Sequence, residues 1–319
     1  MMINTKNILS DMILAGGPPR SGTTFLAKCL NSHPNIVTAI DDHVYENWAI
    51  YYYRTRVGLV QKLRDGQVKL SDVAGLIQTS LITDEKLSGA APSEKVASYP
   101  LTQPPVRPDG GSLAGDLKIK RHTIPLSYFK SDMSLCLKSP EISFVLPELA
   151  EALPNARFIL VYRHVTEIAE SMYRKGATVK VPVYTKRWLN ERDESVKLLA
   201  PPGVPEKWWD LWHEVSDFKR CLIYSVSYMD AMMARLSRLA VNRYFIYNHN
   251  DLKHSAKKIF KGIAQFLSVD ETGFEEAIPW IREEKTTIPP DLMREYEDFI
   301  SDIDGESSYM AAESMKYQG

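Results

Sequence analysis

The segment Leu14-Ala-Gly-Gly-Pro-Pro-Arg-Ser-Gly-Thr-Thr-Phe25 decides the fold of this 319-residue chain. A short apolar run, Met12–Ala15, leads into it, and an amphipathic run that stops near Asn31-Ser-His-Pro34 follows it. This order predicts a strand, a tight turn and a helix. Glycines let the backbone approach an anion, and the first N–H groups of a helix bind one. The donors expected here belong to Ser21, Gly22, Thr23 and Thr24.

The same segment differs from an ATP-binding loop at one position. Gly17, Gly22 and Thr24 match the pattern G-x-x-x-x-G-K-[ST], but Thr23 occupies the lysine position. Arg20 is the only cation in the loop. We therefore expect the loop to hold a phosphate and not to hydrolyse a γ-phosphate; the alternative is an ordinary strand–helix turn with a serine or threonine cap.

Composition and charge indicate a soluble enzyme with one domain spanning residues 1–319. The chain is 44% hydrophobic and 25% charged, with a formal net charge of −1, which favours neither general nucleic-acid binding nor binding to an anionic membrane. No apolar run approaches the roughly 18 residues of a membrane span, so a cytoplasmic location is expected. The three cysteines are widely spaced, which predicts buried thiols and neither a zinc site nor a disulfide: Cys29, Cys136 and Cys221.

Apolar runs that resemble strands alternate with helical patterns, which predicts an α/β fold with a parallel sheet flanked by helices. Besides the first strand, the predicted strands are Ile36–Ala39, Leu117–Ile119, Leu135–Leu137, Arg157–Tyr162 and Tyr244–Tyr247. The predicted helices are Val44–Leu63, Glu141–Leu153, Val165–Lys175, Glu206–Leu239 with a possible break, and Leu252–Leu267. Residues 64–115 are expected to form an irregular insertion, rich in proline and glycine from residue 89 onward, and residues 303–319 a loose tail.

A second candidate anion site follows the predicted strand Arg157–Tyr162. Arg163 comes directly after it, at the sheet edge where open α/β proteins bind ligands. Ser171 lies eight residues further along a predicted helix, and eight steps of about 100° bring it to within roughly 80° of the starting direction. One phosphate therefore fits between Arg163 and Ser171. Alternatively, the arginine forms a salt bridge.

Together, the two signals resemble a known family. Pro19-Arg-Ser-Gly-Thr-Thr24, followed downstream by Arg163 and Ser171, is similar to the two signatures of sulfotransferases that use 3′-phosphoadenosine 5′-phosphosulfate (PAPS). Leu137-Lys-Ser-Pro140 and Tyr247-Asn-His-Asn-Asp-Leu252 add to the resemblance. It covers landmarks from about residue 12 to 268 and implies the P-loop-like sulfotransferase fold with helical insertions.

The resemblance also implies roles for these residues. The first loop, from Pro19 and Arg20 through Ser21, Gly22, Thr23 and Thr24, would hold the 5′-phosphosulfate, and Arg163 with Ser171 the 3′-phosphate. Arg20 would bridge the 5′-phosphate and the leaving oxygen, and Lys138 would reach the sulfonate unless it is simply a solvated lysine. No metal is implied.

Transfer to a hydroxyl needs a general base, and the family places it after the second strand or after the Leu137–Pro140 element. The first position falls within Asp41-Asp-His-Val-Tyr-Glu46, where His43 and Asp42 rank first and Glu46 next. Glu141 at the second position ranks last, because a first-turn helix residue that complements the dipole is the better interpretation of it. The whole cluster has the alternative of a solvated acidic loop.

The sequence thus favours a PAPS-dependent sulfotransferase (EC 2.8.2 type) that acts on a small-molecule or carbohydrate hydroxyl, needs no metal and releases adenosine 3′,5′-bisphosphate (PAP). A P-loop kinase is the enzymatic alternative and lacks its loop lysine. The non-enzymatic alternative is a catalytically silent module that binds a nucleotide. The sequence identifies neither the acceptor nor the oligomeric state.

Overall fold

The computed structural model describes residues 11–40, 82–84, 98, 121–124, 129–144, 146–176, 204, 208, 212, 214–281 and 288–303. Its centre is a five-stranded sheet in which every recorded pair of neighbours is parallel. In spatial order the strands are β2 (Ile36–Ile40), β5 (Ser134–Lys138), β1 (Ile13–Gly16), β6 (Arg157–Tyr162) and β7 (Tyr244–Asn248). The predicted parallel sheet is confirmed.

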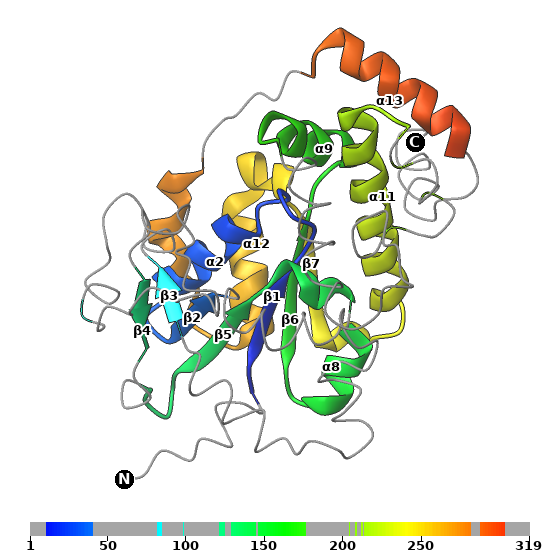
Figure 1. Ribbon diagram of the computed structural model, residues 1–319. Coiled ribbons are helices and arrows are strands. Elements are labelled where there is room, and N and C mark those ends of the chain that lie inside the picture. The colour runs from blue at the N-terminus through cyan, green and yellow to red at the C-terminus, as the bar shows by residue number, and fades with distance from the viewer. Residues whose placement is uncertain are drawn as a thin grey trace, which may run out of the picture.

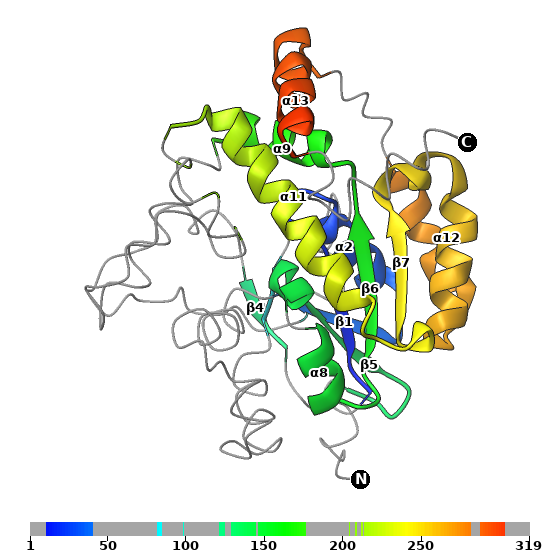
Figure 2. The same cartoon turned by 90° about the vertical axis from the view of Figure 1, so that its right-hand side faces the viewer.

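Helices cover both faces of this sheet, as Figures 1 and 2 show. Side chains alternate along a strand, so Ile13 of β1 faces one core and Leu14 faces the other. The Ile13 side packs against α2 (Thr23–Ser32), α12 (Leu252–Leu267) and the 3₁₀ helix η8 (Glu271–Trp280). The Leu14 side packs against α8 (Leu146–Ala152), α9 (Val165–Arg174) and α11 (Asp217–Leu236), with α13 (Pro290–Ile303) beyond α11. The result is the P-loop-like α/β arrangement expected from the sequence.

One predicted helix, Glu141–Leu153, is divided in two. The structure has a 3₁₀ helix, η3 (Pro140–Phe144), and then α8 from Leu146. Pro147 explains the division, because it has no N–H to donate and its ring would collide with the carbonyl group four residues earlier. A proline is tolerated only in the first turn of a helix, and α8 begins one residue before it.

The helix predicted over Glu206–Leu239, with a possible break, is interrupted: residues 214–216 are not helical, and α11 covers Asp217–Leu236. It begins at Asp217, because the Ser216 side chain accepts a hydrogen bond from the Lys219 N–H and caps it. Trp212 is fully buried and Trp208 packs against the same core, so the aromatic residues before the helix contribute to packing. The three cysteines are free and buried, as predicted.

Parts of the predicted organisation lie outside the described residues. These are the strand 117–119, the helix 44–63 and residues 304–319 of the tail. β3 (Ile82–Asp84) lies within the predicted insertion and pairs antiparallel with β4 (Arg121–Thr123), which lies beyond it. In the part of the chain that the structure describes, no helix is long and apolar enough to cross a membrane.

The strand register places the ends of four strands beside one another. Ala15 of β1 lies opposite Lys138 of β5, and Gly16 lies opposite Leu160 of β6. Tyr162 and Asn248, the last residues of β6 and β7, lie opposite each other. The segments that follow these strands therefore meet at one edge of the sheet, and this edge carries the candidate site.

Candidate functional site

The loop between β1 and α2 is pressed against β6. Gly17 has φ +139°, and a Cβ there would lie 2.0 Å from the carbonyl oxygen of Val161. The buried hydroxyl oxygen of Ser21 lies 2.6 Å from the Pro18 carbonyl oxygen and 3.0 Å from that of Val161. Only glycine fits at position 17, and the Ser21 hydroxyl holds the loop closed against the strand.

The N-terminus of α2 points its N–H groups into this loop. The N-cap residue is Gly22, with φ +101°, so no side chain caps the first N–H groups from this position. The helical bonding begins with the Leu26 N–H donating to the Gly22 carbonyl group at 2.9 Å. The first N–H groups of a helix have no partner within it, and its dipole favours negative charge there. Thr24 is exposed and Thr23 is buried, so the two predicted hydroxyl donors differ in accessibility.

Arg20 connects the loop with the second candidate site. It adopts a left-handed backbone conformation, with φ +70°, and its Nε donates to the Ser171 Oγ on α9 at 3.1 Å. The two residues are 151 positions apart in the chain. The structure therefore brings together the cation of the first predicted anion site and the serine of the second.

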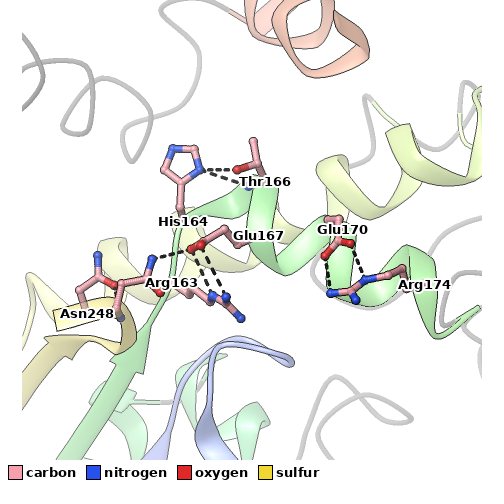
Figure 3. A network of polar contacts seen from close by, with 8 residues as sticks. Arg163, His164, Thr166, Glu167, Glu170, Arg174 and Asn248 are labelled. Carbon is pink, nitrogen blue, oxygen red and sulfur yellow. Dashed lines mark hydrogen bonds and ion pairs between the residues drawn. The ribbon is translucent and has the colours of Figure 1, made fainter. Parts of the chain in front are cut away.

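Arg163 is paired with a carboxylate. Its Nε lies 3.1 Å from Glu167 Oε2 and its Nη2 lies 3.5 Å from Oε1, which is the salt bridge raised as the alternative above. Figure 3 shows the Glu167 side chain reaching from α9 toward Arg163 at the end of β6. Both side chains are largely buried, with exposed fractions of 11% for Arg163 and 16% for Glu167. The predicted 3′-phosphate arginine is thus present at the sheet edge, with its charge balanced by Glu167.

The segment after β7 contributes residues that the sequence interpretation did not assign to the site. The Asn250 Nδ2 donates to Glu167 Oε2 at 2.7 Å, and the backbone N–H of Asn250 donates to Asn248 Oδ1. The His249 ring lies against Gly22, where an added Cβ would be 2.5 Å from its Nδ1, and meets the Phe25 ring edge-on. The sequence could have pointed to Glu167, because it lies four residues after Arg163, the spacing of an ion pair on a helix. For His249 and Asn250 the only sequence signal is their position after a strand, which is weak.

The other predicted site residues fall into two groups. Lys138 is the last residue of β5, next to β1, and is half-buried. Pro19 lies in the loop after β1 and is also half-buried. His43, Asp42 and Glu46 lie outside the described residues, and the Glu141 side chain is not described, so their roles stay predictions. Among the described residues, no group of three or more His, Cys, Asp or Glu side chains is arranged to hold a metal ion.

A family model described as "Sulfotransferase family" matches residues 13–273. The chain belongs to the sulfotransferase family. The matched range includes the β1 loop, Arg163, Ser171 and the segment after β7. No curated protein matches the chain.

Solved sulfotransferase structures also resemble the chain, at low identity. The enzyme from Alicyclobacillus acidocaldarius is 10% identical, with 91% of each chain covered and a TM-score of 0.45. The sulfotransferase domain from the curacin biosynthetic pathway is 15% identical, covering 87% of this chain and 80% of its own, with a TM-score of 0.44. The domain from the Synechococcus PCC 7002 olefin synthase is 16% identical, covering 89% and 82%, also with a TM-score of 0.44.

Proposed function

We propose that this sulfotransferase transfers a sulfuryl group from PAPS to a hydroxyl group of a small-molecule or carbohydrate acceptor. The hydrogen bond from Arg20 to Ser171 is the observation that supports this donor. It brings the loop after β1 into direct contact with α9, the helix that follows β6. PAPS carries a 5′-phosphosulfate and a 3′-phosphate on one ribose, and two neighbouring groups of cationic and N–H donors match that pair of anions.

In this proposal the loop after β1 and the start of α2 bind one end of PAPS, and the end of β6 with α9 binds the other. The N–H groups at the start of α2 and the Thr24 hydroxyl bind the 5′-phosphosulfate. Arg163 and Ser171 bind the 3′-phosphate, and Arg20 lies between the two anions. Pro19 and the buried Ser21 stabilise the conformation of the loop. Gly22 and Thr23 contribute backbone donors at the same end of the helix.

The reaction needs no change of oxidation state. The acceptor oxygen attacks sulfur, so a new S–O bond forms as the S–O bond to the 5′-phosphate breaks. The electrons of the broken bond leave with PAP, and the acceptor proton passes to a general base, for which His43 and Asp42 rank ahead of Glu46 and Glu141. Arg20 and Lys138 stabilise the charge that develops on the leaving oxygen and the sulfonate.

Isothermal titration calorimetry without magnesium tests the donor. The proposal requires PAP to bind at least tenfold more tightly than ATP. Tight binding of ATP that depends on magnesium would favour the kinase alternative. If PAP binds but PAPS sulfates no acceptor in a panel of phenols, alcohols and sugars, the silent module replaces the enzyme. Transfer of the labelled sulfuryl group from PAPS to an acceptor supports the enzyme.

A further inference from the structure

We propose that Glu167 is a positioning residue that orients Arg163 for the 3′-phosphate of the donor. This inference rests on the proposed function, because it takes PAPS as the donor. Glu167 touches neither the transferred group nor the reacting oxygen in this assignment. It acts through Arg163, and through Asn250 on the neighbouring strand end.

The contacts of one carboxylate oxygen carry the inference. Glu167 Oε2 accepts from Arg163 Nε at 3.1 Å and from Asn250 Nδ2 at 2.7 Å. Arg163 follows β6 and Asn250 follows β7, two adjacent strands whose last residues lie opposite each other. Glu167 lies in the first turn of α9, so a single carboxylate joins a helix to both strand ends.

The geometry of the guanidinium explains why this pairing orients Arg163 and does not simply neutralise it. Both contacts with Glu167 use the edge of the planar group that carries Nε and Nη2. A guanidinium has five N–H donors in a fixed plane, so holding one edge fixes the direction of the opposite edge. A phosphate can then meet an ordered arginine without displacing the carboxylate, and the cost of ordering a long side chain is reduced before binding.

Glu167→Gln is the most informative substitution, because it keeps the size and shape of the side chain and removes its negative charge and one of its two acceptor oxygens. A carboxylate accepts hydrogen bonds at both oxygens, whereas an amide has one acceptor and an NH₂ group that donates. With its amide oxygen in the position of Oε2, the glutamine of Glu167→Gln keeps the bonds from Arg163 Nε and Asn250 Nδ2 but sets its NH₂ group against Arg163 Nη2. With the amide reversed, the bonds from Arg163 Nε and Asn250 Nδ2 are both lost. In either orientation the two-point contact with Arg163 is broken, and the guanidinium loses its fixed direction.

The helix offers a matched control. Glu170 pairs with Arg174 at the same i, i+4 spacing but in the reverse order, and Figure 3 shows this pair further along α9. The Glu170 side chain is 5% exposed, so Glu170→Gln removes the same charge from a carboxylate that is even more enclosed than Glu167, on the same helix. Its partner Arg174 is 65% exposed and has no assigned role in donor binding.

The experiment compares the binding of PAP and of adenosine 5′-monophosphate (AMP), which lacks the 3′-phosphate, by calorimetry. Glu167→Gln is expected to weaken PAP binding by about tenfold or more, the usual effect of losing a bond to a charged group, and to change AMP binding by less than about twofold. Glu170→Gln is expected to leave both affinities within about twofold of the original chain. Urea unfolding of all three proteins establishes that each is folded at the titration temperature.

Other results overturn the inference. An equal loss of PAP and AMP binding in Glu167→Gln would mean that the residue only supports the fold. Tighter PAP binding would mean that the carboxylate competes with the phosphate. If the unsubstituted chain binds PAP no better than AMP, the proposed donor itself is wrong, a result distinct from the first two.

Discussion

Gly17→Ala tests whether the β1 loop is held against β6 as the structure has it. The added methyl group would lie 2.0 Å from the Val161 carbonyl oxygen, on a residue whose φ of +139° is essentially restricted to glycine. The backbone conformation alone costs about 1–3 kcal/mol. The loop must also move away from β6, which breaks the contact between Ser21 and Val161 at about 0.5–1.5 kcal/mol. These two terms together lower the unfolding free energy by about 1.5–4.5 kcal/mol.

Gly176→Ala is the matched control. Gly176 also has a positive φ, +59°, but no atom of the residues that the structure describes lies within 4 Å of a Cβ added there. The left-handed conformation costs alanine about 1–2 kcal/mol, and the smaller entropy of the unfolded alanine chain returns about 0.4–1 kcal/mol. A net loss of about 0–1.6 kcal/mol is expected. The same gain from the unfolded chain applies to Gly17→Ala, so the clash with the Val161 carbonyl oxygen and the loss of the Ser21 contact make Gly17→Ala the less stable of the two variants.

The assay is equilibrium unfolding in urea, followed by titration of PAP into the folded variants. Gly17→Ala should lower the unfolding midpoint clearly more than Gly176→Ala and weaken PAP binding by about tenfold or more, because the N–H groups of α2 move with the loop. If the two variants are equally stable and bind PAP equally well, the loop does not lie against β6 and the reasoning fails.

Three further predictions concern single side chains. Ser171→Ala removes the hydroxyl that accepts from Arg20 and should weaken PAP binding by about tenfold, with little change for AMP; equal losses for both nucleotides would remove Ser171 from the 3′-phosphate. Burial raises the pKa of the Cys136 thiol to about 12 and also raises the pKa of Cys29, so both stay neutral thiols at pH 8. Mass spectrometry should find them unmodified by iodoacetamide in the folded chain and modified in urea, and rapid labelling of the folded chain would contradict their burial. His43→Ala and Asp42→Ala should be compared for turnover at saturating PAPS: the general base contributes about 10²–10⁴-fold, and a residue whose loss costs only a few-fold is not the base.

Much of the sheet is predictable from the sequence because its strands are buried on both faces. A strand such as Arg157–Tyr162 has a continuous apolar run, and its bounds in the structure are the predicted ones. The division of the helix predicted over Glu141–Leu153 was also foreseeable, since Pro147 forbids a continuous helix. Periodicity alone carries no information about this, because a proline leaves the apolar pattern unchanged.

The site was predictable where a local pattern carries the chemistry. The loop around Gly17 and Gly22 has a sequence signature, because few residues tolerate positive φ and close backbone approach. The bond between Arg20 and Ser171 depends on how α9 packs beside the β1 loop, which is a tertiary property. The same holds for Asn250, whose contact with Glu167 requires β7 to lie next to β6.

A crystal structure of the protein with PAP bound tests the central claim most directly. The account predicts the 5′-phosphate at the first N–H groups of α2, within about 3 Å of their nitrogens, and the 3′-phosphate within hydrogen-bonding distance of Arg163 and Ser171. Arg163 should still be bonded to Glu167. A 3′-phosphate that points away from both residues, or a nucleotide bound elsewhere on the molecule, would contradict it.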